Sequence, residues 1–152
     1  MGRPGGNGAV MIEIKHKDTG EVLLRVEADT LAGADLAGSR LDGAFLWGAN
    51  LNGANLKRAR LKRANLTGAL LWGANLRGAS LKGADLTGAL LEGAILGEAD
   101  LRGANLQGVR LQGLAWPEAD LRGAKLQGAR YDALTRWPAG VDPQRLGAVK
   151  VR

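Results

Sequence analysis

The sequence predicts an all-β protein folded as a parallel β-helix, and three periodic observations carry the prediction. From residue 31 to residue 131 a central position recurs every five residues, and 19 of its 21 occurrences are leucine. The position two before it is alanine at 17 of 20 sites, and the position two after it is glycine at 16 of 21. The unit Ala-x-Leu-x-Gly thus organises the 152-residue chain.

An α-helix does not fit this period. Five residues advance a helix by about 500°, so successive leucines would spread around it and form no apolar stripe. A glycine in every unit would also cost about 1 kcal/mol each in a helix. In a strand, by contrast, the first and third residues of Ala-x-Leu share one face. We therefore expect each unit to be a three-residue strand followed by a corner, where glycine supplies the positive φ of a type II turn.

Many units carry Asp or Asn between the alanine and the leucine. Such copies include residues 34–36, 49–51, 54–56, 64–66, 74–76, 84–86, 99–101 and 119–121. With these tandem copies the chain resembles the pentapeptide repeat protein family. The resemblance implies a right-handed quadrilateral β-helix of about five coils with 20 residues each, whereas period five alone does not establish four sides. The implied handedness agrees with the general rule for parallel crossovers.

The inward Ala and Leu side chains are expected to interdigitate in a dry core. Such a core leaves no cavity for a cofactor or a small-molecule substrate, so neither is expected. Three larger inward residues fall in the last coil, at Val109, Leu114 and Trp116, and are expected to widen the coil and plug its end. Pro117 follows and lacks an amide proton, so a kink or bulge is expected there.

Four segments follow from these patterns. Residues 1–8 contain no apolar core of a signal peptide and are expected to be a flexible leader. Residues 9–28 alternate apolar and polar residues on both sides of a turn, which predicts a β-hairpin that caps the open end of the coils. Residues 29–133 form the β-helix. Residues 134–152 form a C-terminal cap anchored by Trp137 and Val141, with a helical turn at 143–147 begun by Asp142.

The composition excludes several classes of protein. The chain has no cysteine, hence no disulfide framework and no thiolate chemistry, which fits a cytoplasmic protein. No apolar run reaches the roughly 20 residues that span a bilayer, so no membrane partner is expected. The single histidine, His16, has no nucleophile or carboxylate pair at a suggestive spacing and is expected to be a solvated turn residue. The sequence therefore predicts a protein that is not an enzyme.

Basic residues are densest between positions 57 and 63, and the net charge of the chain is +6. This cluster could dock a phosphate or an acidic protein, or it could be a solvated face that keeps the protein soluble. No aromatic residues interleave with it, which makes nucleic acid an unexpected partner. The candidate anion-binding residues are Lys57, Arg58, Arg60, Lys62 and Arg63.

Apolar residues occupy outward positions in two successive coils. Leu70 and Leu90 stand where Asp or Asn is usual, with Trp72 and Ile95 nearby. A contiguous apolar patch of this kind marks an interface, so we expect a homodimer or a protein partner here, with scattered neutral substitution as the alternative. Phe45 and Trp47 form a smaller outward pair that could pack under the hairpin.

The sequence favours a non-catalytic structural or protein-interaction module. The family resemblance implies an alternative, since some members mimic duplex DNA and bind DNA gyrase. That mimicry needs an acidic surface, whereas residues 29–132 hold 13 Lys and Arg against 10 Asp and Glu. Anion binding through the 57–63 cluster is a further alternative, and the regularity of the repeat also fits a consensus-like designed scaffold.

Overall fold

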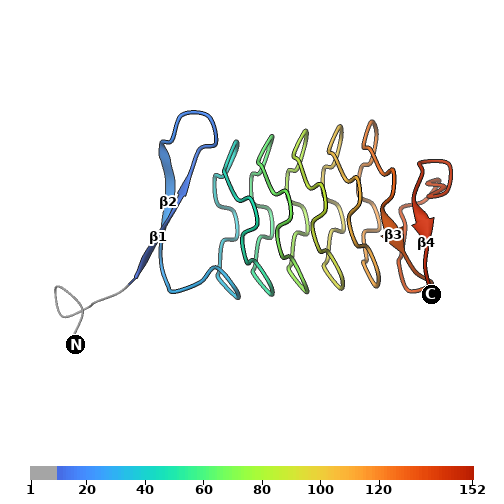
Figure 1. Cartoon of the computed structure of the whole chain (residues 1–152), viewed down its shortest axis with the longest axis horizontal. Coiled ribbons are helices and arrows are strands. Elements are labelled where there is room, and N and C mark those ends of the chain that lie inside the picture. The colour runs from blue at the N-terminus through green and yellow to red at the C-terminus, as the bar shows by residue number, and fades with distance from the viewer. Residues whose placement is uncertain (1–9) are drawn as a thin grey trace.

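The computed structural model describes residues 10–152, which form a row of stacked coils with a hairpin at one end (Figure 1). The predicted flexible leader, residues 1–8, lies outside the described residues. The strands are β1 (Met11–Lys15), β2 (Val22–Glu27), β3 (Arg130–Tyr131) and β4 (Val149–Lys150). Within residues 10–152 there is no helix.

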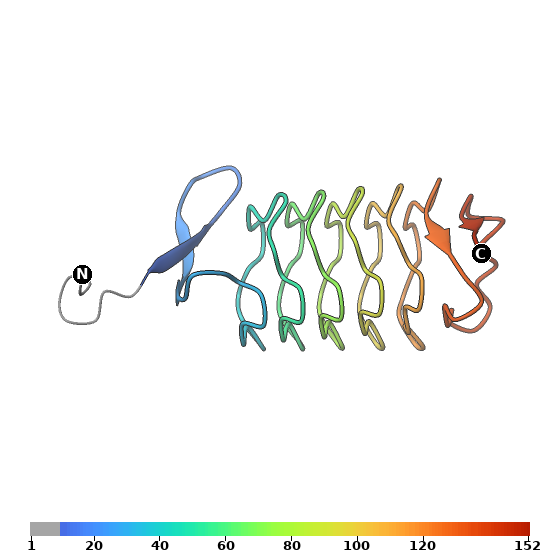
Figure 2. The same ribbon diagram turned by 60° about the horizontal axis from the view of Figure 1, so that its bottom comes forward.

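The coils are joined by parallel bridges between residues 20 apart. Sixteen such pairs run from Asp35 to Arg130. They fall on four ladders, which begin at Asp35, Arg40, Phe45 and Asn50, so one coil holds 20 residues and four bridged positions. Figure 2 shows the coils side by side along the long axis. Each unit contributes one bridged residue rather than the predicted three-residue strand, because the chain turns again before a longer ladder can form.

The corners are four-residue turns with a left-handed third residue. Ala74 N–H, for example, donates to Leu71 C=O at 3.0 Å, and Gly73 between them has φ 62°. The four polar residues that replace glycine at corners keep this conformation, with φ from 57° to 62°: Arg58, Arg63, Glu98 and Glu118. A left-handed residue other than glycine costs of order 1–3 kcal/mol. The ladders on both sides of a corner therefore impose the turn whichever residue occupies it.

Asp and Asn before the central leucine have a structural role that the sequence analysis missed. Their side-chain Oδ1 accepts the backbone N–H two residues later, as in Asn55 to Lys57 at 3.1 Å and Asn75 to Arg77 at 3.0 Å. That N–H points out of the ladder, so a local side chain satisfies it. Where the local side chain is apolar, the previous coil can substitute: Trp72 N–H donates to Asn52 Oδ1 at 2.9 Å.

The core is filled by the predicted inward residues, and all 21 central residues are buried. Val109, Leu114 and Trp116 are fully buried as well, in the position expected for a plug. The Trp116 ring packs on Trp137 of the C-terminal segment with centroids 4.9 Å apart, and Trp137 meets Tyr131 edge-on at 5.2 Å. Trp116 thus extends the core into an aromatic cluster with Trp137 and Tyr131 under the C-terminal cap.

The irregularity of the last coil lies after residue 131 and not at Pro117. Glu98 N–H donates to Pro117 C=O at 3.0 Å in the regular register, so the predicted kink is wrong. Proline fits because its nitrogen occupies the position that points out of the ladder. The register slips instead at Ala115, which bridges Arg136, 21 residues away. The Asp132 carboxylate replaces a ladder carbonyl there and accepts Gly113 N–H at 3.1 Å.

The hairpin of β1 and β2 is antiparallel and continues into the first coil. His16 bridges Ala44, Phe45 N–H donates to Lys15 C=O at 2.7 Å, and Lys17 N–H donates to Gly43 C=O at 2.8 Å. His16 is not a merely solvated turn residue. Its ring is half-buried against Gly43, and its Nδ1 accepts the amide N–H groups of Asp18 and Thr19.

Two predictions at the ends of the coils differ from the structure. Phe45 and Trp47 do not pack under the hairpin, and their side chains are 51% and 63% exposed. Residues 143–147 form hydrogen-bonded turns rather than a helix, although Asp142 Oδ1 does accept Gln144 N–H at 3.1 Å. After these turns β4 pairs in parallel with β3, so the tail adds one more rung to a ladder.

Candidate functional site

The five basic side chains of the predicted 57–63 cluster lie at three separate locations on the surface. Lys57 and Arg58 line a groove of about 280 Å³. Arg60 points to Asp42, with Nη2 and Oδ2 3.5 Å apart. Lys62 and Arg63 line a separate groove beside the hairpin. Successive outward residues of a coil lie on different sides of a corner, so five neighbours in the sequence do not converge on one ligand.

The smaller groove, of about 280 Å³, includes a carboxylate of the protein itself. Its other side chains are Arg77 and Glu98. The Arg77 guanidinium donates to Glu98 Oε1 from Nη2 at 2.6 Å and from Nε at 2.9 Å. Glu98 thus opposes anion binding at this groove.

The larger groove, of about 700 Å³, lies between the hairpin turn and one corner of successive coils. The turn contributes His16, Lys17 and Asp18. The coils contribute two sets of residues spaced 20 apart, one directly after the central leucines and one at the following corners: Asp42, Gly43, Lys62, Arg63, Lys82, Gly83, Arg102 and Gly103. We call this site the hairpin groove. It combines five cationic side chains with two carboxylates.

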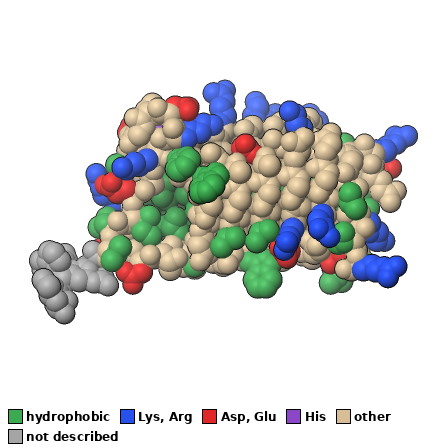
Figure 3. Space-filling model, in the orientation of Figure 1, with side chains coloured by type: hydrophobic (Ala, Val, Ile, Leu, Met, Phe, Trp, Pro, Cys, Tyr) green, Lys and Arg blue, Asp and Glu red, His purple; other side chains and the backbone are tan. Residues whose placement is uncertain are grey.

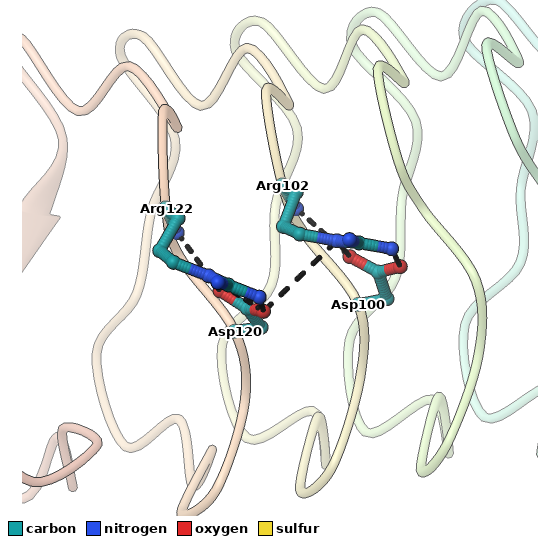
Figure 4. A network of polar contacts seen from close by, with 4 residues as sticks. All are labelled: Asp100, Arg102, Asp120 and Arg122. Carbon is teal, nitrogen blue, oxygen red and sulfur yellow. Dashed lines mark hydrogen bonds and ion pairs between the residues drawn. The ribbon is translucent and has the colours of Figure 1, made fainter.

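Further along the same face, acids neutralise the bases. Figure 4 shows Arg102 lying against Asp100 and Arg122 against Asp120, with Arg102 also turned toward Asp120. Arg102 Nη2 is 2.7 Å from Asp100 Oδ2, and Arg122 Nη2 is 2.5 Å from Asp120 Oδ2. The hydrogen bonds from Arg122 lower the pKa of Asp120 from 3.8 to about 2, and those from Arg102 lower the pKa of Asp100. Both acids are therefore ionised at neutral pH, and this half of the face carries little net charge.

The lowered pKa of Asp120 predicts a pH-dependent contribution to stability. The ionised carboxylate stabilises the fold fully above the ordinary pKa of 3.8, and this contribution is lost as the pH falls through about 2. Asp120→Asn is therefore expected to flatten the fall of the thermal midpoint between those two pH values. Arg122→Gln, which removes the partner, is expected to flatten it in the same way. Equal slopes for the wild type and both variants would contradict the assignment.

The predicted apolar residues lie on two neighbouring ladders of the outer surface, with Ile95 on the ladder of Asn75. Leu70 and Leu90 are bridged neighbours on one ladder and are half-buried, whereas Trp72 and Ile95 are 59% and 45% exposed. We call these four residues the apolar patch. The same ladder continues to Arg110 and then to the rung of β3 and β4. Figure 3 shows hydrophobic side chains at mid-length of the molecule, followed by basic ones toward the C-terminal end.

A further groove of about 620 Å³ separates the last coil from the C-terminal tail. Its lining mixes apolar residues, among them Leu121, Val141 and Leu146, with charged ones. Residues 10–152 contain no group of three His, Cys, Asp or Glu side chains that could hold a metal ion. In the same range no helix has the length and hydropathy to cross a bilayer.

Comparison with known proteins places the repeat in a family. A family model described as pentapeptide repeats matches eight copies, over residues 31–68, 59–97 and 99–130. The chain belongs to the pentapeptide repeat family. This membership implies a right-handed β-helix, which agrees with the four ladders of the described residues.

Solved structures of other pentapeptide repeat proteins are similar to this one. Rfr23 from the cyanobacterium Cyanothece 51142 is 30% identical, with a TM-score of 0.62 over 70% of this chain and 89% of that chain. The protein alr5209 from Nostoc Pcc 7120 is 35% identical, with a TM-score of 0.29 over 77% and 84% of the two chains. The plasmid-mediated fluoroquinolone resistance protein QnrB1 is 16% identical, with a TM-score of 0.41 over 77% and 79%. Among curated proteins, none matches the chain with significance.

Proposed function

We propose that this pentapeptide repeat protein is a non-catalytic interaction module, a right-handed four-sided β-helix that binds a protein partner through its apolar patch. The filled core supports this function, because its inward positions carry no charged side chain. The observation that carries the proposal is the exposure of Trp72 and Ile95 beside the Leu70–Leu90 rung. Asp or Asn is the commonest residue at the position that Leu70, Leu90 and Ile95 occupy, directly before the central residue. A rigid ladder holds these side chains in place without a partner.

The occupant that we propose first is a second copy of the chain. A two-fold axis between Leu70 and Leu90 would set each of them against the other in the partner, which is the self-complementary arrangement of a closed dimer. The same axis would set Arg110 opposite Asn50 and Trp72 opposite Glu92, so no like charges would meet. A different protein partner is the alternative.

The test is the solution mass measured against concentration by light scattering or sedimentation. The wild type is expected to dimerise, and Leu70→Asp with Leu90→Asp is expected to be monomeric, because two carboxylates per copy would be desolvated in the contact. Ser80→Asp with Asn105→Asp is the matched control. It adds the same two charges at equivalent positions of two other ladders, where Arg60 and Lys125 are the bridged cationic neighbours, and should leave the dimer intact. A wild type that is monomeric at every concentration would contradict self-association. If Leu70→Asp with Leu90→Asp had the same mass as a dimeric wild type, the dimer contact would lie outside the apolar patch.

The gyrase alternative has less support. Mimicry of DNA requires rows of negative charge, whereas residues 29–132 carry 13 Lys and Arg against 10 Asp and Glu. Two acids of that region, Asp100 and Asp120, are moreover bound by Arg102 and Arg122. We therefore do not assign a gyrase-binding role to this chain.

A further inference from the structure

The hairpin groove has unpaired positive charge at one place. Lys62, Lys82, Arg102 and Arg122 repeat at the same position of successive coils. Two residues before each of them stand Arg60, Ser80, Asp100 and Asp120, respectively. The later pair therefore binds its own carboxylates, whereas no ion pair holds the side chains of Lys62, Arg63 or Lys82 within residues 10–152. The free charge is concentrated in the half of the face next to the hairpin.

The fold also brings these charges toward one another. The coils stack about 4.8 Å apart, which is the separation of the Lys62 and Lys82 backbones. The Arg63 side chain lies over the next corner, since a Cβ on Gly83 would be 3.5 Å from Arg63 Cγ. From the other wall, the Lys17 ammonium donates to the Arg63 carbonyl. Four cations from the turn and two coils thus surround the corners at 63 and 83.

The acids of the groove do not cancel this charge. The Asp42 carboxylate accepts Lys62 backbone N–H at 2.9 Å and faces Arg60 at 3.5 Å. Asp18 lies in the hairpin turn and makes no ion pair in the described part of the chain, so it offsets one of the four free cations and leaves an excess of three. Like charges packed at this spacing repel one another, so an anion with several charges gains from all of them at once.

We propose that the hairpin groove binds a small oligophosphate, a chain of two or three linked phosphates, through Lys17, Lys62, Arg63 and Lys82. The volume of about 700 Å³ fits a compact ligand. The groove contains no Phe, Tyr or Trp on which a base could stack, and its His16 ring is packed against Gly43. Inorganic tripolyphosphate and the phosphate tail of a nucleoside triphosphate are therefore expected to bind alike.

Nucleic acid fits the groove less well than a small anion. The free charge spans about two coils, or roughly 10 Å, before Asp100 and Asp120 neutralise the face. That length covers few backbone phosphates, and the affinity of nucleic-acid binding grows with the number of phosphates neutralised. Figure 3 shows a row of basic side chains along the edge that starts beside the hairpin. Because Arg102 and Arg122 are paired with carboxylates (Figure 4), this row is not a continuous line of free positive charge for a nucleic-acid backbone.

The experiment is isothermal titration calorimetry of the full chain with sodium tripolyphosphate, with a nucleoside triphosphate in a parallel arm. The wild type is expected to bind both equally, and less tightly as salt rises from about 50 to about 200 mM. Lys62→Gln with Lys82→Gln is expected to weaken binding by about tenfold or more, because it removes two charge-assisted hydrogen bonds. Asp42→Asn keeps an oxygen for the Lys62 N–H but removes a negative charge, and is expected to tighten binding.

The matched control is Arg110→Gln with Lys125→Gln, which removes the same charge from other faces. It is expected to bind tripolyphosphate as the wild type does. Equal weakening in both double variants would show attraction by net charge alone and would overturn the site, as would a wild type that releases no heat at low salt. A stronger affinity for duplex DNA than for tripolyphosphate, lost in Lys62→Gln with Lys82→Gln, would replace the oligophosphate by nucleic acid. A nucleoside triphosphate that binds much more tightly than tripolyphosphate would contradict the absence of a base contact.

Discussion

Trp116→Ala is expected to lower the free energy of unfolding by about 3–5 kcal/mol, the usual range for a tryptophan removed from a core. The Trp116 side chain is fully buried and packs on Trp137, which anchors the C-terminal segment. Its removal opens a cavity at the end of the core and withdraws one side of the aromatic cluster. The measurement is denaturant unfolding followed by far-ultraviolet circular dichroism.

Two further variants make this result specific. Trp47→Ala removes the same side chain from the outer surface, where it is 63% exposed, and should change stability by about 0.5 kcal/mol or less. Trp116→Leu restores the usual central residue of the repeat and should cost less than Trp116→Ala. It loses ring contacts, but it also removes an indole N–H that is buried without a partner. If Trp116→Ala were no more costly than Trp47→Ala, the plug would contribute nothing to the core.

The repeat itself could be predicted from the sequence because its signal is summed over many copies. Each inward position is sampled about twenty times, and the burial of the central residues from Leu31 to Tyr131 follows from that pattern alone. The corner conformation could be predicted for the same reason. The strand length could not, since a period of five says how often the chain turns but not how many residues pair between the turns.

Features that occur once were harder to predict. The packing of His16 on Gly43 depends on where the hairpin docks, and no local pattern reports a contact between residues 27 positions apart. The general rule for strands predicts a kink at Pro117, but the nitrogen of this proline occupies a position outside the ladder, so no ladder hydrogen bond is lost. The slip in register at Arg136 arises from the Asp132 side chain, which replaces a backbone acceptor.

The candidate sites show the same distinction. The apolar patch could be found in the sequence because Leu70 and Leu90 are one coil apart and share a ladder. The basic cluster was defined by adjacency in the sequence, which corners disperse over different faces. A better guide was the residue two positions before each cation, which decides whether it meets a carboxylate, as the pairs Asp100–Arg102 and Asp120–Arg122 show. Lys17 joins the hairpin groove only through the docking of the turn.

Gly43→Ala is expected to destabilise the protein by about 2–5 kcal/mol, more than the same change at other corners. Gly43 has φ 71°, and a Cβ there would lie 2.2 Å from His16 Nε2 and 2.6 Å from its Cδ2. The ring cannot move aside freely, because its Nδ1 accepts two amide protons of the hairpin turn. The left-handed backbone costs an alanine about 1–2 kcal/mol, and forcing an atom into a packed site adds about 1–3 kcal/mol.

Gly53→Ala separates these two contributions. Gly53 has φ 67° at an equivalent corner, and a Cβ there would meet nothing within 4 Å, so only the backbone cost is expected. In a His16→Ala background the clash at position 43 disappears, and Gly43→Ala should then cost no more than Gly53→Ala. The measurement is the set of unfolding free energies of the four variants of this cycle and of Gly53→Ala. If Gly43→Ala and Gly53→Ala lower the unfolding free energy equally with His16 present, the His16 ring does not hold the hairpin turn against the first coil. The position of Lys17 in the hairpin groove would then not be fixed by this contact.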